Sequence, residues 1–90
     1  MKQLKLSRKE KREIVELYNN DFYDDMIQQY YLMKHKDYFD EVFEATCKEY
    51  EITREQYEND NDLDIDYSDF SLDLMNNLLD NSGVDLEKDY

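Results

Sequence analysis

The chain contains no proline and only one glycine, Gly83, among its 90 residues. Tight hairpin turns depend on glycine for backbone conformations with positive φ, and proline is the other common turn residue. A chain with almost none of either has few ways to build the turns of a β-sheet, whereas nothing in it interrupts a helix. The sequence therefore predicts an all-α fold.

Apolar side chains recur every three or four residues in four segments, which is the spacing of one face of a helix. The pair Ser7 and Glu10 has the spacing of a capping box ahead of the first segment, and Thr53 and Gln56 repeat it ahead of a short helical turn at residues 55–58. In a capping box each side chain bonds the other residue's backbone. The four stripes are Ile14, Val15 and Tyr18; Tyr23, Met26, Ile27, Tyr30 and Met33; Phe39, Val42, Phe43, Cys47 and Tyr50; and Phe70, Leu74, Met75, Leu78 and Leu79.

Residues 1–90 are expected to form one domain, because a chain of this length has room for a single core. Asp37 is the predicted cap of the third stripe, and Gly83 lies just past the last one, where a helix often ends with positive φ. We expect a compact bundle of three main helices plus one or two short ones, the short turn lying at residues 55–58. The remaining parts are a basic N-terminal segment (1–12), an acidic loop (59–66) and a strand-like or frayed tail (84–90).

Charge is distributed very unevenly along the chain. Six of the eleven basic side chains lie in residues 1–12, whereas 23 of the 24 carboxylates lie outside that segment. Such self-repulsion opposes compaction, yet aromatic residues make up 14% of the chain, which argues against disorder. The single cysteine, Cys47, cannot form an internal disulfide, and no apolar run is long enough to span a membrane. These features predict an acidic, folded protein of the bacterial cytoplasm without a membrane association.

The carboxylates follow a pattern. Those at residues 37–44 share one helical face, opposite the apolar stripe, and in an extended 59–66 loop alternate aspartates would lie on one side about 6–7 Å apart. Leu63 and Ile65 would then point the other way and anchor the loop. The predicted partner-binding carboxylates are Asp37, Asp40, Glu41, Glu44, Glu51, Glu55, Glu58, Asp60, Asp62, Asp64 and Asp66.

A row of negative charges at this spacing is comparable to the phosphates of one nucleic-acid strand. Proteins that bind nucleic acid gain much of their affinity by neutralising such a row. The leading hypothesis is an inhibitor that occupies the basic channel of a nuclease or other nucleic-acid enzyme, without direct DNA binding by the acidic body. Two alternatives stay open: a surface that is only solvated, and an interaction module that docks an exposed Tyr30–Tyr31 pair on a transcription or regulatory protein.

Catalysis and metal binding find little support. Asp60, Asp62 and Asp64 resemble the start of an EF-hand loop, but its sixth position is Ile65 where glycine is needed and its twelfth is Ser71. His35, the only histidine, is expected to be exposed at a helix end, and Cys47 to be a core residue. There is no glycine-rich phosphate loop and no Cys/His cluster. We expect no enzyme activity and no cofactor.

The basic N-terminal segment has three possible roles. Lys9, Lys11 and Arg12 can pair with the acidic body of the same chain, lie at the interface of a homodimer, or contact nucleic acid held by the target.

The segment Asp37-Tyr-Phe-Asp-Glu-Val-Phe-Glu-Ala and the later stretch Leu63-Asp-Ile-Asp-Tyr-Ser resemble the Ocr-like DNA-mimic inhibitors of phages. In both, an aromatic pair, an acid, an aliphatic residue and phenylalanine lead into an acidic stretch with interspersed aliphatic residues. The resemblance implies inhibition of a host restriction or CRISPR nuclease. The chain departs from that class in its basic N-terminal helix and in lacking a long acidic C-terminal tail.

Overall fold

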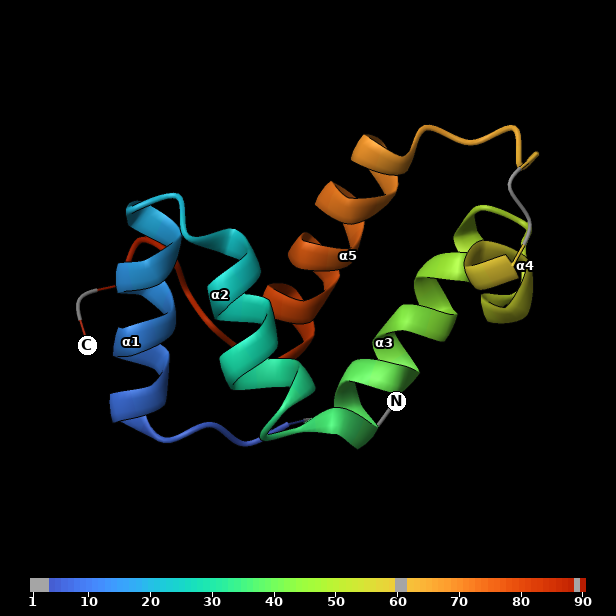
Figure 1. The fold of residues 1–90 in the computed structure, drawn as a ribbon. Helices are drawn as coiled ribbons and strands as arrows, with labels where there is room; N and C mark the ends of the chain where they lie inside the picture. The colour runs from blue at the N-terminus through green and yellow to red at the C-terminus, as the bar shows by residue number, and fades with distance from the viewer. Residues whose placement is uncertain (1–3, 60–61, 89) are drawn as a thin grey trace.

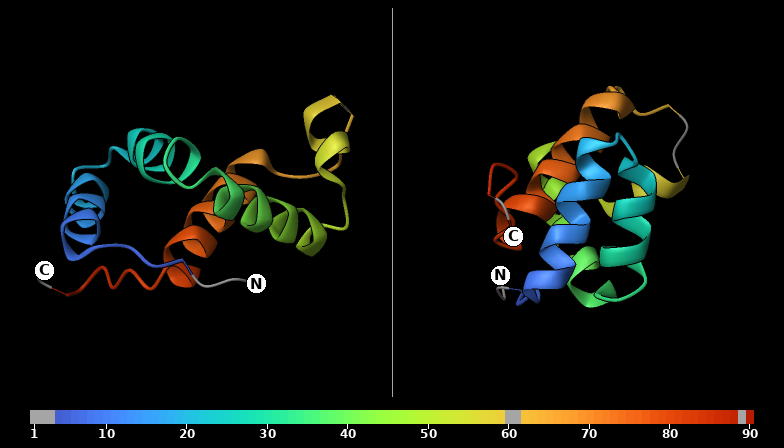
Figure 2. Two further views of the ribbon diagram at one scale, coloured as in Figure 1. Left: turned by 90° about the horizontal axis from the view of Figure 1, so that it is seen from below. Right: turned by 90° about the vertical axis from the view of Figure 1, so that its left-hand side faces the viewer.

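A computed structural model describes residues 4–59, 62–88 and 90. Its helices are α1 (Arg8–Asn19), α2 (Tyr23–Ile27), the π-helical turn η1 (Gln28–Leu32), α3 (Lys36–Glu49), α4 (Arg54–Asn59) and α5 (Tyr67–Asn81). No strand occurs in the described ranges, so the predicted all-α class is confirmed. The molecule measures 42 × 27 × 20 Å, with α1 at one end of its long axis and α4 at the other (Figures 1 and 2).

Both predicted capping boxes are present. The Glu10 amide donates to Ser7 Oγ at 3.1 Å, and the Ser7 amide donates to Glu10 Oε1 at 3.3 Å. Thr53 and Gln56 make the equivalent pair of bonds at the start of α4, at 2.9 and 3.1 Å. Gly83 follows α5 with φ +76°, the conformation that its position predicted. These ends were predictable because each depends on residues within one helical turn.

The third helix starts two residues earlier than expected, and the predicted cap is wrong. Lys36 is its first residue and His35 its N-cap, and the His35 side chain makes no capping hydrogen bond to the helix. Asp37 lies inside the first turn instead, where its negative charge interacts favourably with the positive end of the helix dipole.

The core is built where α3 crosses α5. Val42, Phe70 and Leu78 are completely buried there, together with Thr46, whose hydroxyl donates to the Val42 carbonyl at 2.8 Å. Asn77 of α5 donates its side-chain amide to the same hydroxyl at 3.0 Å. The polar groups at this crossing are therefore hydrogen-bonded, as burial requires.

The second helix does not keep the predicted single stripe. After α2 the backbone widens into the π-helical turn η1, which shifts the angular position of every later side chain. As a consequence Met33, predicted to lie on the stripe, is 77% exposed, whereas Tyr31 is completely buried and Tyr30 is 8% exposed. The prediction that Tyr30 and Tyr31 form an exposed pair is therefore wrong.

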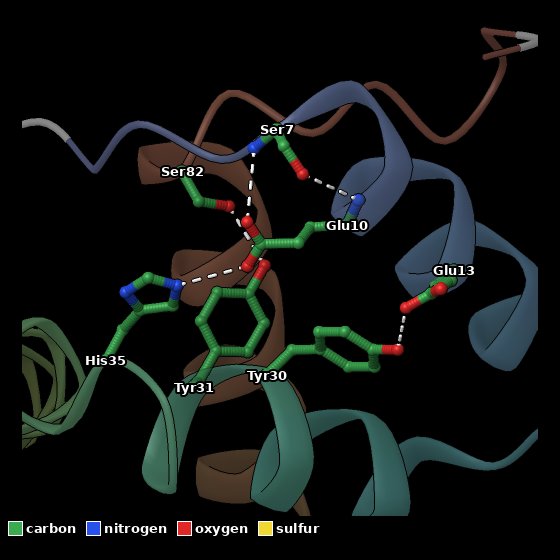
Figure 3. Close-up of polar contacts among 7 residues, drawn as sticks. All are labelled: Ser7, Glu10, Glu13, Tyr30, Tyr31, His35 and Ser82. Atoms are coloured by element: carbon green, nitrogen blue, oxygen red, sulfur yellow. Dashed lines mark hydrogen bonds and ion pairs between the residues drawn. The ribbon is translucent and has the colours of Figure 1, made fainter.

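Both tyrosines hold neighbouring helices, as Figure 3 shows. The Tyr31 hydroxyl hydrogen-bonds Ser82 Oγ at 2.9 Å, just beyond the end of α5, and burial raises the pKa of Tyr31 to about 12. Tyr30 donates its hydroxyl to the Glu13 carboxylate of α1, and this bond raises the pKa of Tyr30 to about 12. The π turn is thus fixed by contacts on two sides.

His35 also differs from its prediction. Its side chain is only 25% exposed, and Nε2 lies 3.2 Å from Glu10 Oε2 (Figure 3). Burial alone would raise the pKa of Glu10, but the hydrogen bonds with His35 and Ser7 lower it overall. The helix-end histidine therefore joins the start of α3 to the capping box of α1.

The tail after α5 folds back along α1. Val84 is buried, Leu86 packs against the core, and the Tyr90 hydroxyl accepts the Asp85 amide at 3.0 Å. Residues 84–88 and 90 form no strand, so the strand-like alternative is wrong, and the packing of Val84 and Leu86 shows that this part of the tail is not frayed. The chain ends beside α1 (Figure 1).

Candidate functional site

Aromatic rings hold α4 against the α3–α5 crossing. Tyr57 stacks on Phe70 with ring centroids 4.5 Å apart and meets the edge of Phe43 at 5.1 Å. The Arg54 guanidinium lies 4.9 Å from the centre of the Phe43 ring. A six-residue helix has little stability of its own, so these contacts are what place its side chains.

Arg54 also pairs with two of the predicted carboxylates. Its Nη1 lies 2.7 Å from Asp40 Oδ1, its Nε lies 3.2 Å from Glu58 Oε1, and Lys36 reaches Asp40 at 3.9 Å. The hydrogen bond with Asp40 raises the pKa of the Arg54 guanidinium. Asp40 and Glu58 are thus ion-paired within the chain and fix α4 on α3.

Most of the other predicted carboxylates are exposed and have no partner among the residues that the structure describes. Within the described ranges they make no ion pair and no side-chain hydrogen bond, and each is exposed. They belong to α3, to the turn that follows it, to α4 and to the 62–66 segment. This set is Asp37, Glu41, Glu44, Glu51, Glu55 and Asp64.

The acidic face of α3 continues onto α4. Burial raises the pKa of the Cys47 thiol, and the carboxylates of Glu44 and Glu58 are near enough to raise it further. Glu44, Arg54 and Glu58 are therefore all within electrostatic range of the same buried cysteine. The structure brings the α3 and α4 carboxylates into one neighbourhood, which we call the acidic end (residues 37–66).

The described part of the acidic loop supports only a shortened row. Asp62 and Asp64 are exposed while Leu63 and Ile65 are partly buried, and Ile65 packs against the core, as the alternation predicted. Asp66 does not continue the row as a free anion, because its carboxylate caps α5 and accepts the Ser68 amide at 2.9 Å. Asp60 lies outside the described residues.

Further carboxylates on α5 extend the negative surface, and sequence reasoning missed them. Asp73 accepts a hydrogen bond from the Tyr50 hydroxyl at 2.5 Å, which raises the pKa of Tyr50 to about 12. Asp69 and Glu49 lie near enough to the same hydroxyl to raise its pKa further. The spacing of Asp69 and Asp73, one helical turn apart, was the signal that could have found them. Residues 37–73 hold fourteen carboxylates and two basic side chains, Lys48 and Arg54.

Glu51 holds an unusual backbone conformation at the acidic end. It follows the C-cap of α3 with φ +59°, while its amide bonds the Lys48 carbonyl and the Ile52 amide bonds the Cys47 carbonyl, both at 3.0 Å. Glycine is the usual residue at this position of a helix end. A side chain in the left-handed region costs about 1 kcal/mol, and here it places one more carboxylate beside α4.

Replacing Glu51 by glycine is expected to raise the free energy of unfolding by about 0.5–1 kcal/mol, because glycine tolerates positive φ. Glu51→Gln removes the same charge but keeps a side chain, so its unfolding free energy should stay within about 0.5 kcal/mol of the parent. Urea unfolding followed by circular dichroism measures both. Equal stability of the two variants would show that the backbone conformation carries no strain.

The described residues contain no group of three or more His, Cys, Asp or Glu side chains placed to hold a metal ion. Over the same ranges, no helix has both the length and the apolar character required to cross a bilayer. Cys47 is 1% exposed and packs in the core.

Comparisons with protein-family models, curated proteins and solved structures gave no match to this chain.

Proposed function

We propose that this protein inhibits a nucleic-acid-binding enzyme by placing its acidic end in the enzyme's basic channel, where the carboxylates substitute for phosphates. The observation that carries the proposal is a set of exposed carboxylates that form no ion pair within the described ranges, next to an aromatic cluster that holds α4 on α3 and α5: Asp37, Glu41, Glu44, Glu55 and Asp64. The helices that carry these carboxylates are already folded, so binding has to order only side chains and not the backbone, which lowers the entropic cost of binding. The protein acts by occupying the channel and not by catalysis.

A restriction or CRISPR nuclease in the bacterial cytoplasm is the target class that we favour. The Ocr-like pattern of residues 37–45 supports it, since that stretch forms the α3 face from which Asp37, Glu41 and Glu44 project. The competing idea of an exposed Tyr30–Tyr31 docking pair loses its support, because both rings are buried.

Affinity capture from a bacterial lysate tests the proposal directly. The immobilised protein should retain a nucleic-acid enzyme at about 0.15 M salt and release it as salt approaches about 1 M, because the Debye length falls from about 8 to 3 Å. Duplex DNA added at constant ionic strength should displace the same enzyme, since both ligands need the same channel. An enzyme that stays bound at high salt and is not displaced by DNA would rule out mimicry.

A further inference from the structure

The opposite end of the molecule carries a basic surface that the acidic end does not explain. Arg8, Lys11 and Arg12 of α1 lie beside the folded-back tail, which contributes Lys88 and Tyr90. We call these five residues the basic end. The Lys11 and Lys88 ammonium groups lie 5.8 and 5.4 Å from the centre of the Tyr90 ring, so one aromatic side chain lies among four cations.

None of these four cations has an ion-pair partner within the described part of the chain. That is unexpected in a protein with 24 carboxylates. Of the acids of α1, Glu10 bonds His35 and Glu13 bonds Tyr30, whereas Glu16 lies near Arg12 and forms no ion pair with it. Within the described residues, none of the ion pairs considered for Lys9, Lys11 and Arg12 with the acidic body is formed, so these cations are available to an external anion.

The surface between the cations is hollowed. One hollow of about 380 Å³ is lined by Arg8, Lys11, Lys88 and Tyr90. A second, of about 240 Å³, shares Lys88 and Tyr90 with the first and is bordered by Arg12, with Glu16 as its one carboxylate. Two adjoining hollows with shared walls can accept successive groups of a linear anion.

We propose that the basic end binds the phosphates of a nucleic-acid strand, with the Tyr90 ring available to stack on a base. Arg8 and Arg12 lie one turn apart on α1, so their side chains are neighbours. Guanidinium groups bind phosphate through two parallel hydrogen bonds, and aromatic rings between cations are the usual means of holding a single strand. A second copy of this chain could supply carboxylates to these cations, but such ion pairs would not use the Tyr90 ring.

The overall negative charge does not prevent this contact. At about 0.15 M salt the Debye length is about 8 Å, whereas the long axis of the molecule is 42 Å. A phosphate at the basic end therefore interacts mainly with the cations that it touches.

The biological role of this contact rests on the proposed function. The acidic end enters the target's channel, while the basic end holds nucleic acid that the target still carries. Binding to one partner raises the effective concentration of the other contact.

A short single-stranded oligonucleotide tests the proposal at about 0.1 M salt. Titrated into isotope-labelled protein, it should shift the amide resonances of Arg8, Lys11, Arg12, Lys88 and Tyr90 and leave those of residues 40–58 unchanged. Each phosphate contact to a single strand contributes a slope of about −0.7 to the dependence of log K on log salt. The Arg8→Gln/Arg12→Gln variant should therefore bind about tenfold more weakly, with a slope shallower by about 1.4.

Lys34→Gln/Lys48→Gln removes the same charge from exposed positions elsewhere and should change neither quantity. Absence of binding, equal losses in both double variants, or shifts centred on residues 40–58 would overturn the proposal. Sedimentation showing that the basic end holds a second copy would overturn it as well. The two functions fail separately, because neutralising the acidic end should abolish capture of the enzyme and leave oligonucleotide binding intact.

Discussion

Replacing Glu44, Glu51, Glu55 and Asp64 by their amides is expected to weaken binding to the captured enzyme about 100-fold. All four are exposed and unpaired within the described ranges, so nothing inside the chain competes for them. An exposed ion pair contributes about 0.7 kcal/mol, and four of them contribute about 3 kcal/mol, where each 1.4 kcal/mol is a factor of ten. Association should slow as well, because complementary charge steers the encounter. Surface plasmon resonance on the captured enzyme measures both quantities.

The matched control changes the net charge equally at other places. Amides at Glu16, Asp24, Asp25 and Asp80 remove four exposed carboxylates that do not belong to the acidic end. This variant should bind within about threefold of the parent, because contacts beyond a Debye length are largely screened. If both variants lost affinity alike, total charge and not the acidic end would determine binding.

Three of the helix ends could be predicted because they depend on neighbours in sequence. Ser7, Thr53 and Gly83 each act within one turn of their own helix, and no distant contact alters them. The π turn could not be predicted in this way. It is fixed by Tyr31, which bonds Ser82 across 51 positions, and by Tyr30, which bonds Glu13. A spacing pattern that assumes 3.6 residues per turn fails where tertiary contacts change the turn.

Which carboxylates belong to the acidic end could also be predicted, but not which of them are ion-paired or cap a helix. The pairing of Asp40 with Arg54 depends on the angle at which α4 returns to α3, and that angle is set by the packing of Tyr57 on Phe43 and Phe70. Asp66 had two possible roles, in the acidic row or as the cap of α5. The cap prevails because the unbonded amides at the start of α5 need an acceptor.

The function proposed for the acidic end depends on a buried ring, and Phe70→Ala is expected to have the largest effect on stability. Phe70 is completely buried and contacts Tyr57, Tyr50 and Phe43 at ring distances of 4.5, 5.2 and 5.5 Å. Truncation of a buried phenylalanine costs about 3–5 kcal/mol, against a total of about 5–13 kcal/mol for a domain of this size. At about 4–8 °C per kcal/mol, the Tm should fall by at least about 12 °C.

Leu72→Ala, two residues along α5, is the control: its side chain is 53% exposed, so the unfolding free energy should change by less than about 0.5 kcal/mol. Calorimetry measures both Tm values. Below the lowered Tm, Phe70→Ala should remain helical in α1, α3 and α5 while α4 loses the ring on which Tyr57 stacks. Hydrogen exchange at Tyr57 and Glu58 should then rise more than at Val42. Uniform loss of protection would mean that α4 and the core unfold as one unit, and that Glu55 and Glu58 are held by the whole fold rather than by this single stacking contact.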